Sequence, residues 1–142
     1  MKREYLEDAI RSGIPISRQM DFRVRELTEQ SIEVSGGASE NINVHNTAFA
    51  GSLYSICTLA AWGLTFSKLP KGSALVMAKA EIEYLRPVKG EIVACGQISE
   101  QQSARLLADL EEQGKGRLDL EISVKNSAKL AVKFTAHLHV KL

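Results

Sequence analysis

The chain has 142 residues, with 18 basic and 17 acidic side chains and a formal net charge of +1. That length suits one domain with a real hydrophobic core and leaves little room for a second. The near-neutral balance excludes a field strong enough to recruit nucleic acid or an acidic membrane without specificity. We therefore expect a single domain over residues 1–142 that has no nucleic-acid partner.

The amino terminus and the cysteines indicate a cytoplasmic protein. The opening MKREYLEDAIRSG is charged and has no apolar signal region, so nothing suggests export. The two cysteines, Cys57 and Cys95, lie in apolar contexts without the spacing of metal ligands. We expect both to be small buried hydrophobic residues in a reducing compartment.

The first third of the chain predicts one helix and one or two strands. Apolar residues recur on one side of residues 3–12, and Gly13 and Pro15 mark the end of that helix. Residues 22–34 then predict a strand or a hairpin pair that ends at the glycines of 36–37.

Residues 41–66 carry no charged side chain, although 25% of the protein is charged. Residues 48–66 would span about 28 Å as a helix, which is long enough for a membrane. However, the strands that follow each offer an apolar face, and one uncharged helix could cover them all. Ser52, Ser55, Thr58 and Thr65 would also make a poor membrane span. We therefore expect a buried helix and no membrane segment.

Beyond residue 74 the apolar residues alternate with polar ones, which is typical of half-buried strands. Four strands are predicted, over residues 74–86, 91–99, 117–126 and 129–142. In the first of them, Ala78, Ala80, Ile82 and Tyr84 are expected to share one face. The pattern predicts an antiparallel sheet and an α+β fold.

Two further signals interrupt the strands. A capping box at 99–102 predicts a helix that ends at Gly114, and residues 125–129 predict a hairpin turn. His137 and His139 fall on the polar face of the last strand. A metal site needs more convergent ligands, so we expect solvated surface histidines and no metal.

Two segments resemble one known family. The stretch NINVHNTAFAGSLY (residues 41–54) resembles the helix-start motif of hot-dog domains of the YiiD C-terminal type, and AEIEYLRPV (80–88) resembles the strand that follows. The resemblance covers nearly the whole chain. It implies a hot-dog fold, in which a curved antiparallel β-sheet wraps around a long central α-helix. Members are labelled thioesterases, and the group includes malonyl-acyl-carrier-protein decarboxylases (lyases) of bacterial fatty acid synthesis.

The resemblance also implies a site at the start of the helix. In hot-dog enzymes a backbone N–H at this point holds the thioester carbonyl, and the matching donor here is Gly51. Asn43 matches a loop asparagine beside that carbonyl, although its sequence context also fits a cap or turn residue. These two residues are the catalytic candidates. The candidates for substrate binding are His45, Thr47, Ala50, Ser52 and Thr58.

An expected carboxylate is missing. Many hot-dog thioesterases carry an Asp or Glu on the central helix, where this chain has Thr58, and no acidic residue occurs between Glu40 and Glu81. His45 could act as a general base or could pack the loop. Cys57 is a poor nucleophile candidate, because the middle of a helix offers no activating environment.

Three functions follow from these residues. The first is decarboxylation of malonyl-acyl carrier protein to acetyl-acyl carrier protein, because neutral donors suit the enolate that forms. The second is hydrolysis of an acyl thioester, and the third is a non-catalytic acyl-thioester binding domain. We expect no cofactor beyond the phosphopantetheine of acyl carrier protein or CoA that carries the substrate. We also expect at least a homodimer, because hot-dog sites are generally completed across a dimer interface.

Overall fold

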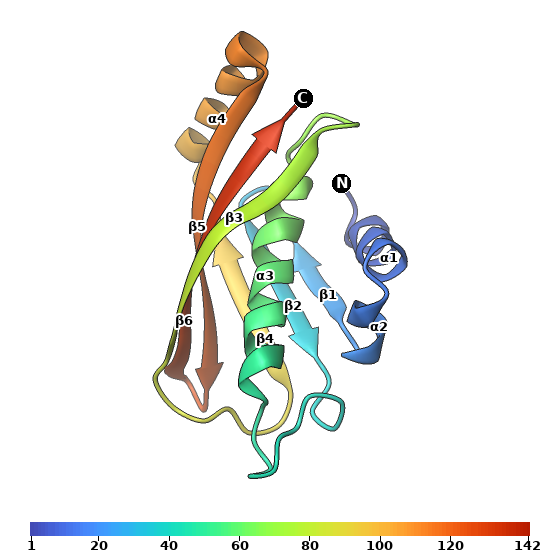
Figure 1. The fold of residues 1–142 in the computed structure, drawn as a ribbon, viewed down its shortest axis with the longest axis vertical. Coiled ribbons are helices and arrows are strands. Elements are labelled where there is room, and N and C mark those ends of the chain that lie inside the picture. Colours follow the sequence, from blue (N-terminus) through green and yellow to red (C-terminus); the bar gives the residue numbers. More distant parts are fainter.

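A computed structural model describes all 142 residues. Ten elements follow one another along the chain: α1 (Arg3–Gly13), α2 (Ile16–Gln19), β1 (Arg23–Leu27), β2 (Ser31–Gly36), α3 (Ala50–Phe66), β3 (Ala74–Tyr84), β4 (Ile92–Gln97), α4 (Glu100–Gln113), β5 (Lys115–Asn126) and β6 (Lys129–Lys141). The strands form one antiparallel sheet in the order β1-β2-β4-β5-β6-β3. The sheet curves around α3, which confirms the expected hot-dog fold (Figure 1).

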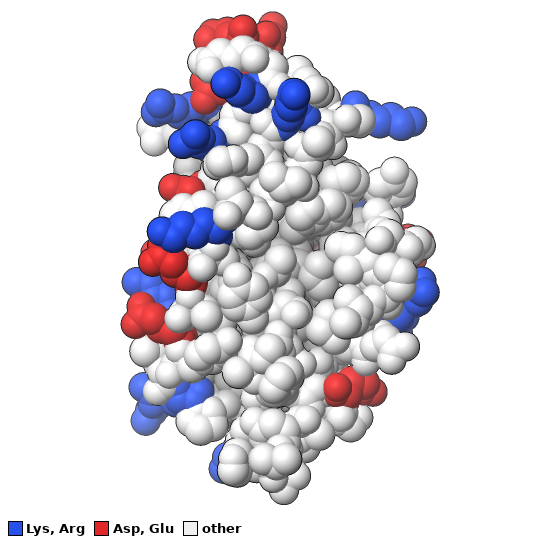
Figure 2. Space-filling view, viewed as in Figure 1, with Lys and Arg blue, Asp and Glu red and all other residues white.

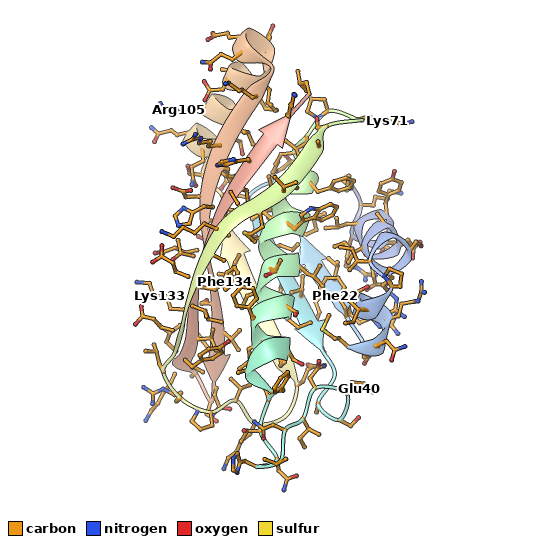
Figure 3. The ribbon with its side chains drawn as sticks, viewed as in Figure 1. Phe22, Glu40, Lys71, Arg105, Lys133 and Phe134 are labelled. Carbon is orange, nitrogen blue, oxygen red and sulfur yellow. The ribbon has the colours of Figure 1, made fainter.

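The central helix α3 is buried on one side only. Nine of its residues are buried in the core, among them Ile56, Ala60 and Leu64. Phe134 projects from β6 towards α3 (Figure 3), and its ring lies edge-on to that of Tyr54 at 5.3 Å. No helix of the structure is long and apolar enough to cross a membrane.

The other side of α3 forms an open stripe, which corrects the expectation of a fully buried helix. Tyr54, Thr58, Trp62 and Phe66 follow one another at intervals of four residues and remain partly exposed. Such spacing places them on one face of the helix. Figure 2 shows that this face of the molecule carries no Lys, Arg, Asp or Glu over the helix, while charged side chains stand along the rim.

The helix α1 closes the β1 edge of the sheet. The Arg3 guanidinium donates to the Val24 carbonyl at 2.9 Å, and the Val24 N–H donates to the Glu7 carboxylate at 2.9 Å. Arg11 donates in the same way to the carbonyl of Phe22 at 2.9 Å. Side chains of α1 therefore take the place of a neighbouring strand, which protects an edge that would otherwise pair with another chain.

The opposite edge, β3, has no such cover. This strand of 11 residues pairs only with β6, so its outer backbone groups face away from the sheet. A bulge between Met77 and Lys79 shifts the alternation. Ala78 is consequently exposed and does not share the face of Ala80 and Ile82 as predicted. A bulge adds one residue to one strand, which no two-residue period can anticipate.

Most other local predictions are confirmed. The capping box at Ser99 is formed, and Gly114 ends α4 with a φ of 73°. The predicted hairpin joins β5 to β6 through Ser127 and Ala128, whose φ angles of 50° and 66° belong to a type I′ turn. The helix α2 was not predicted, because its four residues are too few to show a helical period.

His137 links three strands on the solvent side of the sheet. Its Nδ1 lies 2.8 Å from Asp119 on β5, and its Nε2 lies 3.3 Å from Glu81 on β3. The hydrogen bond with Asp119 raises the pKa of His137 above its ordinary 6.5, and the bond with Glu81 adds to the effect. His137 is thus held between two carboxylates, unlike the freely solvated residue that the sequence predicted, whereas His139 is exposed.

We predict that this cluster makes stability fall as the pH rises. Because folding raises the pKa of His137, the folded state holds the proton more tightly than the unfolded state. The contribution is complete below pH 6.5 and is lost as the pH rises through the folded pKa. Denaturant unfolding of the wild type between pH 5 and 9 should show this slope, and His137→Gln should flatten it. The control His139→Gln should keep the wild-type slope; equal slopes in all three proteins would contradict the prediction.

Candidate functional site

The loop before α3 is held closed by its own backbone. The Phe49 N–H donates to the carbonyl of Asn41 at 2.7 Å, and the Asn43 N–H donates to the carbonyl of Thr47 at 2.8 Å. The Ala48 N–H donates to the carbonyl of Val88, at 2.8 Å, just after β3. These bonds fix the direction in which the chain enters the helix.

The side chain of Asn43 organises the same loop. Its Oδ1 accepts from the backbone N–H of His45 at 2.8 Å and of Thr47 at 3.2 Å. Its Nδ2 donates to Thr47 Oγ1 at 3.0 Å and, more weakly, to the carbonyl of Ala48 at 3.3 Å. Asn43 is therefore the turn residue that its sequence context allowed. To donate to a substrate, the Asn43 Nδ2 would give up its weaker hydrogen bond, the one to the Ala48 carbonyl.

Asn41 anchors the start of the loop, and no sequence pattern predicted this role. The side chain is buried, and its Nδ2 donates to the carbonyls of Met20 at 2.9 Å and Gly37 at 2.7 Å. Its Oδ1 has no hydrogen-bond partner. Asn41 thereby ties the end of β2 to the chain that leads into α3.

The first turn of α3 has no cap. Phe49 occupies the N-cap position without a side-chain hydrogen bond, and the turn contains no acidic residue. The N–H groups of Ala50 and Gly51 have no acceptor within the protein, and both residues are exposed. Free N–H groups and the positive end of the helix dipole attract a negatively charged oxygen. This arrangement provides the donor that the resemblance assigned to Gly51.

Two aromatic side chains frame the uncapped turn, and the sequence analysis assigned neither of them to the site. A Cβ on Gly51 would lie 2.5 Å from the Phe49 ring, so the ring lies directly against the glycine. From the end of β3, the Tyr84 hydroxyl donates to the Ala50 carbonyl at 3.0 Å. Burial raises the pKa of Tyr84, so its hydroxyl is a neutral donor. Only the three-dimensional packing brings these rings to the helix start.

The remaining candidates are spread around this turn. Thr47 lies against Asn43, Ser52 is half-buried, and His45 is exposed with no hydrogen bond from its ring. The Thr58 hydroxyl donates to the Tyr54 carbonyl at 2.9 Å, about two turns further along the open stripe. Loop and helix start therefore form one cluster, and Thr58 lies apart from it.

The two cysteines differ in their surroundings. Cys57 is buried in the core, where desolvation raises the pKa of its thiol to about 12 and disfavours the nucleophilic thiolate. Cys95 is exposed on β4, which contradicts its predicted burial. It faces outwards because the buried residues of that strand are its neighbours Ala94 and Gly96.

Comparison with known proteins identifies the family. The family described as "Putative thioesterase (yiiD_Cterm)" matches residues 3–141. The chain belongs to the YiiD C-terminal thioesterase family. The uncapped helix start thus lies in a family associated with acyl thioesters.

Solved structures agree with this assignment. A "putative thioesterase" from Shewanella oneidensis is 30% identical over 99% of this chain and 96% of its own, with a TM-score of 0.87. A protein of unknown function from Chlorobaculum tepidum TLS is 26% identical over 98% of this chain and 93% of its own, with a TM-score of 0.92. A Pseudomonas aeruginosa protein, 16% identical with a TM-score of 0.88 over 99% of this chain and 96% of its own, shares the fold.

We predict that Gly51→Ala lowers turnover without unfolding the protein. The added methyl group would meet the Phe49 ring at 2.5 Å, and this ring is 54% exposed, so it can swing away across the helix start. The displaced ring blocks access to the Gly51 N–H, so turnover of an acyl thioester should fall by about 10² to 10³-fold, the range for loss of one oxyanion donor, with little change in the melting temperature. Gly13→Ala is the control, because nothing lies within 4 Å of its added Cβ. Wild-type turnover in Gly51→Ala would show that the Phe49–Gly51 contact has no part in the site.

Proposed function

We propose that this family member decarboxylates malonyl thioesters to acetyl thioesters, with the acyl group carried on the phosphopantetheine of acyl carrier protein or CoA. The observation that supports this proposal most strongly is the uncapped, uncharged first turn of α3. The reaction needs no other cofactor. Its product, acetyl-acyl carrier protein, would serve to initiate fatty acid synthesis in the cytoplasm.

The chemistry matches neutral donors. The bond between the substrate's carboxylate and its α-carbon breaks, CO2 leaves, and the bonding electrons move onto the thioester as an enolate. The Gly51 N–H stabilises the negative oxygen, with the amide of Asn43 as a second donor. The α-carbon then takes a proton from water. No proton has to be removed first, so the reaction needs no general base.

Hydrolysis has a different requirement, and it is the second candidate because of the family's description. Water must be activated, but α3 carries no acidic or basic residue. By the family resemblance, Thr58 stands where many hot-dog thioesterases carry the carboxylate. His45 is the available base, and its exposed ring has no group that orients it. A carboxylate near the helix start would also repel the malonyl carboxylate and the enolate.

Product analysis separates the functions. The protein is incubated with malonyl-carrier protein, malonyl-CoA and acetyl-CoA, and the products are resolved by mass. We expect acetyl thioester from the malonyl substrates and no consumption of acetyl-CoA. Free thiol would instead identify a hydrolase, and binding without any product would identify a non-catalytic binding domain.

We predict that Asn43→Asp loses decarboxylation while the loop stays folded. The aspartate keeps the oxygen that accepts from the N–H groups of His45 and Thr47. It removes the donor and places a negative charge beside the developing oxyanion. The rate should fall by about 10² to 10³-fold, the range for loss of one oxyanion donor.

Asn43→Ala is the companion variant. It removes all the loop contacts of the side chain, so it should lower both the rate and the melting temperature. Asn43→Asp should lower the rate alone. Near-normal acetyl-thioester formation by Asn43→Asp would refute the assigned role, and a gain in free thiol would favour the hydrolase.

We further propose that the active form is a dimer joined at β3. The β1 edge is closed by α1, whereas β3 is open and lies beside the uncharged stripe of α3. Phe49, Ala50 and Gly51 at the start of α3 are exposed, so one chain leaves this site open to solvent. A second copy paired at β3 would cover the stripe and wall the site.

Ala78→Pro tests the dimer. Ala78 is the bulge residue and is skipped in the pairing with β6, so proline can be accommodated there while it blocks an outer partner strand. Sedimentation should show a dimer for the wild type and for the control Ala78→Ser, and a monomer with little turnover for Ala78→Pro. A wild-type protein that is monomeric at micromolar concentration and fully active would contradict the proposal.

A further inference from the structure

A second feature lies at the end of the sheet away from the start of α3. A hollow of about 890 Å³ lies between α4 and the adjoining ends of β5, β6 and β3. Four cationic side chains line it together with a single acidic residue, Asp109: Arg105, Lys115, Arg117 and Lys141. None of the four forms an ion pair within the chain. We call these four residues and their hollow the basic groove; Figure 2 shows Lys and Arg gathered at that end, below an acidic tip.

The strand register places two lysines directly opposite one another in the basic groove. Lys115 of β5 pairs with Lys141 of β6, and two residues further on Arg117 pairs with His139. Directly opposed like charges destabilise a sheet. The next row along the same strands is different, because Asp119 there pairs with His137. Between β5 and β6, the repulsion between cations thus lies at the groove, where an external anionic partner would relieve it.

We propose that the basic groove docks the acidic surface of the carrier protein that bears the thioester; this inference rests on the proposed function. All four cations are exposed and spread over α4, β5 and β6. A site for one phosphate group would need donors that converge on a point. Dispersed cations instead match several carboxylates on a protein face and speed its association.

The basic groove also borders β3, the strand at which the proposed dimer is joined. Ala74 and Val76, at the beginning of β3, line the groove, and Tyr84 ends the same strand. If two copies of β3 pair antiparallel about their middle, Ala74 of one copy lies beside Tyr84 of the other. Tyr84 is bonded to the first turn of α3. A carrier protein docked on one copy would therefore present its phosphopantetheine arm to the site of the other copy.

The test is a matched pair of double charge reversals. Arg117→Glu/Lys141→Glu removes two groove cations, and the control Lys125→Glu/Lys133→Glu makes the same change at the other end of β5 and β6. Figure 3 shows Lys133 well apart from Arg105 along the molecule. Binding of holo-carrier protein and of CoA is measured by calorimetry at two salt concentrations, with thermal melts of each protein. Turnover of malonyl-pantetheine by the wild type tests the proposed function separately.

We expect the groove variant to bind the carrier protein at least about tenfold more weakly, as for charges that steer an interface. CoA binding should be unchanged, the control should match the wild type, and salt should weaken carrier binding. The melting temperature of the groove variant should stay level or rise, because the repulsion between Lys115 and Lys141 is relieved. Equal carrier affinity in the groove variant, no carrier binding by the wild type, or a loss of CoA affinity instead would each overturn the proposal.

Discussion

The helix α3 begins with backbone N–H groups that no part of the chain accepts, and much of the surrounding structure serves to keep them available. A loop closed by its own backbone brings the chain to Phe49, whose side chain provides no cap. Tyr84 bonds the Ala50 carbonyl and leaves the N–H groups free. Because the whole helix is uncharged, no internal carboxylate competes for its positive end.

The exposed side of α3 is uncharged as well. If α3 faced only solvent on this side, charged residues could stand there without cost. The open stripe instead consists of Tyr54, Thr58, Trp62 and Phe66. The two sheet edges show a matching difference. Arg3, Glu7 and Arg11 protect the edge at β1, and nothing protects β3. An uncharged stripe beside an open strand is what a self-complementary interface requires, so the proposed site and the proposed dimer interface share one helix.

Much of this could be predicted from the sequence, since patterns local in the chain determine it. The alternation in β5 and β6, the capping box at Ser99 and the uncharged run of α3 each predicted the correct element. The β3 bulge and the short α2 could not be predicted, because one inserted residue or a single helical turn is too short to produce a periodic pattern of apolar residues.

Only part of the site could be predicted from the sequence, because some of its contacts join segments that lie far apart in the chain. Family resemblance pointed to Asn43 and Gly51, but the contacts of Phe49 and Tyr84 depend on packing between distant segments. The opposed charges of the basic groove likewise appear only once the register of β5 against β6 is known.

In the proposed site, the free N–H groups of Ala50 and Gly51 hold the thioester oxygen. Nuclear magnetic resonance of the 15N-labelled protein, titrated with a malonyl thioester analogue that cannot lose CO2, tests it directly. The amide protons of Gly51 and Ala50 should shift downfield and exchange more slowly with solvent as the analogue saturates the protein. Saturable binding that leaves both amides unchanged and perturbs residues elsewhere would contradict it.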